Sequence, residues 1–218
     1  MITQVYEVGT KEEAILVAKA GVDNIGVLVG DGEFPRELGI EKVKEIFDVI
    51  SAPAKKVALT LSSNIEKIEN IVRSLNPDIL HLGALPELLT PDDVSKLKQT
   101  FPNLSIMRSI PVIGEESVEM AKSYEGVADY LLLDSHKIND NQVGATGMVH
   151  DWNISKKIVE SVKIPVILAG GLGADNVASA IQKIRPYGVD SKTRTDKKES
   201  HEKDINEVIK FVQNAKSA

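Results

Sequence analysis

Short apolar segments alternate with longer amphipathic segments along almost the whole chain. Val, Ile and Leu dominate the short segments, which is typical of strands that are buried on both faces of a parallel sheet. The pattern predicts strands at Ile2–Glu7, Asn24–Val29, Lys56–Leu61, Ile79–Leu82, Ser105–Ser109, Asp129–Asp134, Pro165–Ala169 and Gly188–Ser191.

Each predicted strand is followed by a segment in which apolar residues recur with the helical period. Side chains that favour helix N-termini stand at the start of several of these segments, namely Thr10, Asn64, Thr90 and Asn153. The predicted helices are Lys11–Ala20, Gly39–Ser51, Ile65–Leu75, Pro91–Thr100, Glu115–Tyr124, Ile154–Val162, Ala174–Ile184 and Glu202–Lys216.

Repetition of one strand–helix unit predicts an α/β protein with a single domain, residues 1–218, folded as a (β/α)8 TIM barrel. The phrases SLNPDIL, GVADYLL, VKIPVIL and RPYGVD share one form, in which a helix ends at a small or proline-containing turn and an apolar strand begins. Eight units suit a closed barrel, whereas a doubly wound open sheet of about five or six strands would leave units unused.

Composition narrows the class of protein further. Hydrophobic residues make up 42% of the chain and aromatic residues only 4%, so branched aliphatic side chains must build the core. The formal net charge of -6 argues against a surface that binds nucleic acid. No apolar run approaches the roughly 20 residues of a membrane-spanning helix, and the N-terminus does not resemble a signal peptide. We therefore expect a cytoplasmic protein without nucleic-acid or membrane partners.

In a (β/α)8 barrel the chemistry lies on the loops that follow the strands, and the loops after strands seven and eight frequently bind phosphate. Gly170 and Gly171 follow the seventh predicted strand, where their N–H groups and the next helix N-terminus could hold an anion. The loop after strand eight offers two hydroxyls and two cations: Ser191, Lys192, Thr193 and Arg194. The alternatives are a tight turn at the glycines and a basic surface loop, since nearby lysines such as Lys203 are predicted to be solvated.

Two charged residues at other strand ends are candidates for chemistry. Asp134 ends the apolar segment YLLLD, where a partly desolvated carboxyl would have a raised pKa suited to acid or base catalysis. The alternative for Asp134 is a helix cap or a loop brace. Arg36, after the second predicted strand, could clamp a carboxylate with two hydrogen bonds, although surface arginines are common.

These residues carry a resemblance to a known family. The stretch VILAGGLGADNVASAIQKIRPYGVD, residues 166–190, resembles the corresponding part of phosphoribosylanthranilate isomerases, and AGVDNIGVLV, FPR, DYLLLD and GATGMVHDW (144–152) follow in that family's order. The resemblance implies an aldose–ketose isomerase without metal or cofactor. Its substrate would be a small phosphorylated sugar or amino sugar, N-(5-phosphoribosyl)anthranilate, which undergoes an Amadori rearrangement in tryptophan synthesis. Asp134 would then be the acid that opens the furanose ring, Arg36 would hold the anthranilate carboxylate, and Gly170 and Gly171 would hold the phosphate.

Three loops depart from the family's pattern. Tyr6 stands at the cysteine that serves as general base in the family's K-I-C-G-like motif, and the chain contains no cysteine at all. The family's Q-L-H-G corresponds to HLGA, which begins at His81, and its S-S-G-V-E corresponds to SKTRT, residues 191–195. Glu7 and His81 are therefore candidates for proton transfer, because a neutral tyrosine with a pKa of about 10 is a poor base at pH 7. Strand alternation, however, would direct Glu7 towards the helices if Tyr6 faces the barrel interior.

Two further functions stay open. A divergent paralogue could isomerise or epimerise another sugar phosphate with Asp134 and either His81 or Glu7. A protein that has kept the anion site and lost the base would bind a phosphometabolite without turnover. A homodimer is also compatible with the sequence, since barrels associate through their outer helices, but no exposed apolar stripe indicates one.

Overall fold

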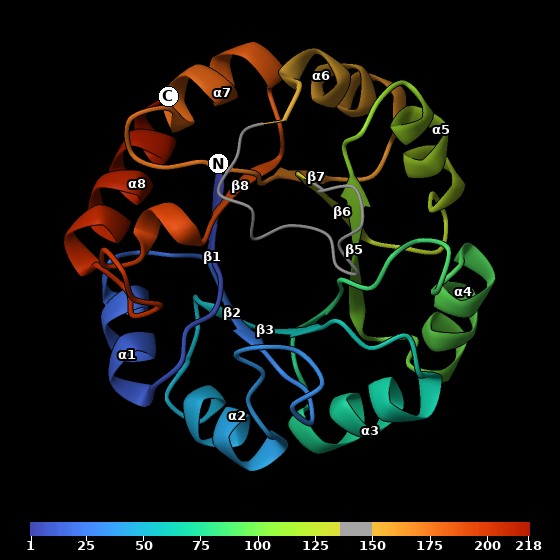
Figure 1. Ribbon diagram of the computed structural model, residues 1–218, viewed down its shortest axis with the longest axis horizontal. Coiled ribbons are helices and arrows are strands. Elements are labelled where there is room, and N and C mark those ends of the chain that lie inside the picture. Colours follow the sequence, from blue (N-terminus) through green and yellow to red (C-terminus); the bar gives the residue numbers. More distant parts are fainter. Residues whose placement is uncertain (136–149) are drawn as a thin grey trace.

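The strands of the protein close into one barrel, seen end-on in Figure 1. The computed structural model describes residues 1–135 and 150–218. In this part of the chain parallel strands pair in chain order, and β8 pairs with β1. The strands are β1 (Ile2–Val5), β2 (Asn24–Leu28), β3 (Lys55–Thr60), β4 (Ile79–Leu82), β5 (Ser105–Pro111), β6 (Tyr130–Asp134), β7 (Val166–Leu168) and β8 (Gly188–Ser191). The predicted (β/α)8 barrel is confirmed.

The helices form a ring outside the strands (Figure 1). They are α1 (Lys11–Lys19), α2 (Ile40–Phe47), α3 (Ile65–Leu75), α4 (Pro91–Thr100), α5 (Glu116–Ser123), α6 (Trp152–Ser161), α7 (Val177–Ile184) and α8 (Ile205–Ser217), with a short 3-10 helix, η1 (Thr193–Thr195), after β8. Thr10 and Asn64 cap their helices by accepting backbone N–H groups, as predicted. Asp151, and not the predicted Asn153, caps α6. Within the described ranges, no helix has both the length and the apolar character needed to cross a bilayer.

The barrel interior is filled by side chains, so the barrel is a packed core and not a pore. This inner cluster comprises Tyr6, Val57, Ile79, Met107, Leu132, Ile167 and Ala169. Gly26 on β2 makes room for the Tyr6 ring, because a Cβ atom at this position would lie 2.0 Å from the ring's Cδ1. A larger apolar cluster fills the layer between the strands and the helices.

Two element boundaries differ from the prediction in ways that affect the loops at the strand ends. β1 ends at Val5 and not at Glu7, whose φ of 58° is outside the range of strand backbone. α7 begins at Val177 and not at Ala174, because the Asn176 side chain accepts the Gly173 N–H and donates to the Gly171 carbonyl, which holds a turn before the helix. The helix N-terminus predicted beside Gly171 therefore begins farther along the chain. Of the stretch GATGMVHDW, residues 144–149 lie outside the described residues.

Candidate active site

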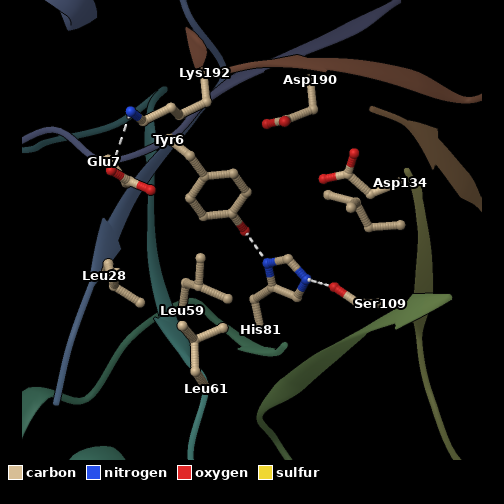
Figure 2. Close-up of a pocket in the computed structure, with 11 residues that line it drawn as sticks. Tyr6, Glu7, Leu28, Leu59, Leu61, His81, Ser109, Asp134, Asp190 and Lys192 are labelled. Atoms are coloured by element: carbon tan, nitrogen blue, oxygen red, sulfur yellow. Dashed lines mark hydrogen bonds and ion pairs between the residues drawn. The ribbon is translucent and has the colours of Figure 1, made fainter. Parts of the chain in front are cut away.

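Three adjoining hollows lie at the ends of the strands from which most of the candidate residues project. The central pocket, shown in Figure 2, is lined by Tyr6, Glu7, Leu28, Leu59, Leu61, His81, Ser109, Leu132, Asp134, Asp190 and Lys192. An outer cavity of about 280 Å³ shares Glu7 and Leu28 with it and adds Arg36. A third hollow, the glycine hollow, shares Asp134, Asp190 and Lys192 with the central pocket and adds Gly170, Gly171, Leu172, Ser191, Thr193 and Arg194. The hollows thus form a row, with the central pocket in the middle.

Glu7 stands between the outer cavity and the central pocket. Its two carboxylate oxygens accept hydrogen bonds from Arg36, one from Nε at 2.5 Å and one from Nη2 at 3.1 Å, and the Lys192 Nζ lies 3.3 Å away. The pairing of Val5 with Ser191 in neighbouring strands brings the residues that follow, Glu7 and Lys192, close together. The expectation that Glu7 faces the helices is wrong: Tyr6 and Glu7 line the same pocket, because β1 has ended and the left-handed backbone turns Glu7 back over the barrel.

The charge state of Glu7 follows from opposing effects. Burial raises the pKa of its carboxyl, but the hydrogen bond from Arg36 and the charges of Lys192 and Arg36 outweigh burial, so the pKa is lowered from its usual value of 4.5. Glu7 is consequently a carboxylate at neutral pH. While it is paired with two cations it is a weak base.

Tyr6, His81 and Ser109 form a hydrogen-bonded chain across the floor of the pocket (Figure 2). The Tyr6 hydroxyl lies 2.5 Å from Nδ1 of His81, and the His81 Nε2 lies 2.7 Å from the Ser109 hydroxyl. Burial, together with the charge of Arg108, lowers the pKa of His81 to about 3. His81 is therefore a neutral ring that both neighbours hold in place.

Asp134 and Asp190 place two carboxyl groups on the same side of the central pocket (Figure 2). Asp134 accepts the backbone N–H of Ser135 at 2.7 Å. Burial, and secondly the charge of Asp134, raises the pKa of Asp190 well above its usual value, and its Oδ1 has no hydrogen-bond partner within the described part of the chain. Both effects favour the protonated form of Asp190. The sequence interpretation missed it, although a carboxyl inside the predicted strand Gly188–Ser191 was a signal that could have been used.

The glycine hollow gathers the residues predicted to bind phosphate. Gly170 and Gly171 both have left-handed backbones, with φ of 82° and 64°, and a Cβ atom at Gly170 would lie 2.5 Å from Nδ1 of His150. Across the hollow, Arg194 forms an ion pair with Asp175 at 2.7 Å, which ties the loop after β8 to the loop after β7. Ser191 and Thr193 line the hollow as well. The structure thus brings the six predicted residues together.

Lys192 connects the hollows through a chain of ion pairs. Its Nζ lies 2.8 Å from Asp196 and 3.0 Å from the Nδ1 of His201, in addition to its contact with Glu7. Asp196 pairs in turn with Lys203, whose side chain is 0% exposed. The prediction that Lys203 is solvated is therefore wrong, because its Nζ pairs with Asp196 and its backbone N–H donates to Glu13. The ionic chain runs Arg36–Glu7–Lys192–Asp196–Lys203.

The described residues contain no group of three or more His, Asp or Glu side chains arranged to hold a metal ion. That the reaction needs neither a metal nor a cofactor remains an expectation from the sequence.

Known proteins resemble this chain over nearly its whole length. The family model for N-(5'-phosphoribosyl)anthranilate (PRA) isomerase matches residues 5–214. N-(5'-phosphoribosyl)anthranilate isomerase 2 of Methanosarcina mazei is 37% identical, covering 94% of this chain and 90% of the relative. The isomerase of Methanocella arvoryzae is 35% identical, covering 94% and 92%.

Solved structures show the same likeness. The PRA isomerase of Pyrococcus furiosus is 26% identical and covers the whole of both chains with a TM-score of 0.76. A PRA isomerase in complex with reduced 1-(o-carboxyphenylamino)-1-deoxyribulose 5-phosphate covers both chains fully at 21% identity, with a TM-score of 0.78, and so shares the fold.

Proposed function

Because the chain belongs to the N-(5'-phosphoribosyl)anthranilate isomerase family, we propose that the residues of the three hollows carry out that family's reaction. The protein is an aldose–ketose isomerase of tryptophan biosynthesis, and its reaction converts the aminoaldose to the aminoketose. The row of three hollows is the main support for assigning roles to these residues. The substrate of that reaction is elongated in the same way, with a carboxylate-bearing ring at one end, a sugar in the middle and a phosphate at the other end.

The two ends of the substrate are assigned to different hollows. The phosphate binds in the glycine hollow, where the N–H groups of Gly170 and Gly171 can approach it closely and Arg194 and Lys192 supply positive charge. The aromatic ring lies in the outer cavity, whose wall includes apolar side chains and the guanidinium of Arg36. This arrangement leaves the sugar in the central pocket, between the charged residues that line it.

The rearrangement needs one proton donor and one proton acceptor. Asp134 protonates the furanose oxygen as the C1–O bond breaks, which leaves a C1–nitrogen double bond. Glu7 then removes the proton from C2, and the resulting enolamine takes up a proton at C1 and loses the hydroxyl proton to become the ketone. Glu7 and Asp134 lie on opposite sides of the pocket (Figure 2), so each can reach a different face of the sugar. Asp190 lies beside Asp134, and its raised pKa favours the protonated form, which can donate a proton on that side.

Glu7 suits the role of base better than the other candidates do. Both ring nitrogens of His81 have hydrogen-bond partners, and the low pKa of its ring makes it an unreactive base. Burial and the charge of Asp190 raise the pKa of Tyr6 well above 10, so its phenolate is not formed at neutral pH. Glu7 is ionised at neutral pH and borders the pocket.

The test is isomerase activity on freshly generated phosphoribosylanthranilate, followed by the loss of its fluorescence. Asp134→Asn and Glu7→Gln should each lower kcat by about 10²- to 10⁴-fold, the range for loss of a general acid or base, and keep affinity for inorganic phosphate. Glu119→Gln, an exposed carboxyl on α5, is the matched control and should keep full activity.

Absence of turnover in a folded wild-type protein that binds phosphate would contradict the residue assignment. The search would then move to other sugar phosphates, and binding without any turnover would identify a phosphometabolite-binding protein.

A further inference from the structure

The ion pair between Glu7 and Arg36 lies where the outer cavity meets the central pocket. Arg36 lines the outer cavity, and its side chain is 30% exposed, so a molecule in that cavity can reach the guanidinium. Glu7 lines both hollows, and its side chain is only 9% exposed. A ligand that extends from the outer cavity, where Arg36 lies, into the central pocket passes Glu7, which together with Leu28 lines both hollows.

The geometry of the pair is that of a guanidinium bound to a carboxylate ligand. Arg36 donates from Nε and Nη2 to the two separate oxygens of Glu7, which is the two-bond arrangement that arginine uses for carboxylates in general. A second carboxylate cannot bind these two donors in this way while Glu7 holds them. Glu7 and an incoming carboxylate therefore compete for the same two N–H groups.

The backbone of Glu7 gives a second, independent observation. Its φ of 58° is left-handed, a conformation that is unfavourable for a residue with a long side chain. Such strain persists when surrounding contacts hold it, and it is concentrated at functional sites. Because β1 ends at Val5, the Glu7 side chain can move without disturbing the pairing of the strand. Lys192, 3.3 Å away, would retain the carboxylate at the central pocket after it leaves Arg36.

We propose that a carboxylate of the substrate displaces Glu7 from Arg36, and that this exchange frees Glu7 to act as the base. The proposal rests on the proposed function, because that function assigns a carboxylated aromatic ring to the outer cavity. Binding and proton removal are thereby coupled. A phosphorylated sugar that lacks the carboxylate would bind in the glycine hollow and leave Glu7 held by Arg36, so the exchange also selects the substrate.

The charges around Glu7 determine how its pKa responds. Titratable groups from the loop after β2, from β8 and from the loop after β8 face it or its partners: Arg36, Asp190, Lys192, Asp196, His201 and Lys203. Glu13, on the wall of the outer cavity, accepts the backbone N–H groups of Gly9 and Lys203. When Arg36 turns to a ligand, Glu7 loses the hydrogen bonds and the charge of the guanidinium. Burial and Lys192 remain, so the pKa of Glu7 rises from its value in the ion pair. Glu7 then becomes a stronger base.

The direct test is a ¹³C NMR titration of the Glu7 carboxyl carbon, assigned by its disappearance in Glu7→Gln. The probes are anthranilate with inorganic phosphate and, as the matched control, aniline with inorganic phosphate. We expect saturating anthranilate to raise the titration midpoint by about one pH unit, a tenfold change in proton affinity, and aniline to leave it unchanged.

A second measurement uses binding alone. In Glu7→Gln the competing charge is gone, so anthranilate should bind about fivefold more tightly than to the wild type, on the scale of a partly exposed ion pair. A residue that only shaped the cavity would give weaker binding in this variant.

The exchange is overturned if anthranilate does not bind to the wild type, if it binds without moving the Glu7 midpoint, or if Glu7→Gln binds it less tightly. These outcomes are distinct from failure of the proposed function, which the turnover assay reports. Turnover with an unmoved midpoint removes the exchange and keeps the isomerase, whereas a raised midpoint without turnover keeps the exchange for another carboxylated substrate.

Discussion

Replacement of Glu7 by glycine is expected to remove activity while it changes stability very little. A side chain in the left-handed region costs about 1–2 kcal/mol, and glycine relieves this cost. Two losses oppose the gain. Glycine adds about 0.5–1 kcal/mol of backbone entropy to the unfolded chain. The lost ion pairs contribute about 1 kcal/mol or less, because Arg36 can turn to water and Lys192 keeps Asp196 at 2.8 Å.

The sum lies within about 1 kcal/mol of zero, which corresponds to a Tm shift of about 2–4 °C for a domain of this size. Turnover should fall by about 10²- to 10⁴-fold, or about 3–5 kcal/mol of activation free energy, if Glu7 is the base. The two quantities are measured by thermal unfolding followed by circular dichroism and by the fluorescence assay for phosphoribosylanthranilate.

Arg185→Gly is the control for the backbone effect. Arg185 also has a left-handed backbone, with φ of 56°, but it is exposed and ends α7 just before β8 begins, at the other end of the barrel. This variant should be more stable by about 1 kcal/mol and fully active. A Glu7→Gly protein whose kcat/KM stays within tenfold of the wild type would refute the assignment of the base, and a Tm lowered by more than about 10 °C would refute the near-cancellation of the stability terms.

Three other outcomes are expected. Tyr6→Phe removes the hydroxyl that lies 2.5 Å from the His81 Nδ1. The variant should retain activity, and urea unfolding should show a free energy of unfolding lowered by about 1–3 kcal/mol. A stable but inactive variant would show instead that the hydroxyl is catalytic. The pKa of His81 is about 3 in the folded protein and 6.5 ordinarily, so between these two pH values the unfolded chain binds one proton more than the folded protein. The contribution of the neutral ring to the free energy of unfolding is therefore complete above pH 6.5 and is lost as the pH falls towards 3. Urea unfolding between pH 4.5 and about 6 should therefore show a slope about 1.4 kcal/mol per pH unit steeper in the wild type than in His81→Gln, and equal slopes would contradict a neutral buried ring. Gly170→Ala should raise KM by more than about tenfold, a loss of about 1.4 kcal/mol, because the added Cβ would lie 2.5 Å from the Nδ1 of His150. Gly126→Ala is the control: Gly126 has a φ of 85° and open space around it, so this variant carries the backbone strain alone and should leave KM unchanged.

The strand–helix alternation could be predicted because it depends on patterns within short stretches of the sequence. Buried parallel strands must be apolar along their whole length, and each helix must present an apolar stripe to the sheet, so every unit carries its own signal. The prediction from sequence failed where contacts with residues distant in the chain determine the backbone conformation. Glu7 was assigned to a strand because its neighbours alternate, but its contacts with Arg36 and Lys192, and its left-handed backbone, depend on two loops from elsewhere in the chain.

The candidate site was predicted in part for the same reason. Asp134 and the Gly170-Gly171 pair were identified because residues at the ends of the strands lie where the active sites of such barrels are formed. Asp190 was missed because a carboxyl within a short strand is distinguished only by what surrounds it, here the barrel interior and Asp134. In the polar, lysine-rich stretch after β8, Lys203 was predicted to be solvated, because its burial depends on Asp196 and on the docking of the loop.

The sequence alone determined the number and order of the strand–helix units, and with them the closed barrel, because periodicity and turn residues act over a few positions. It also determined which loops could hold phosphate. Only the tertiary structure decided which charged side chains meet. Closure of the barrel pairs β8 with β1 and so brings Lys192 beside Glu7, while the loop after β2 brings Arg36 to the same carboxylate. The pKa values of Glu7 and Asp190 depend on the burial and the neighbouring charges that this closure creates, and no local stretch of the sequence contains that information.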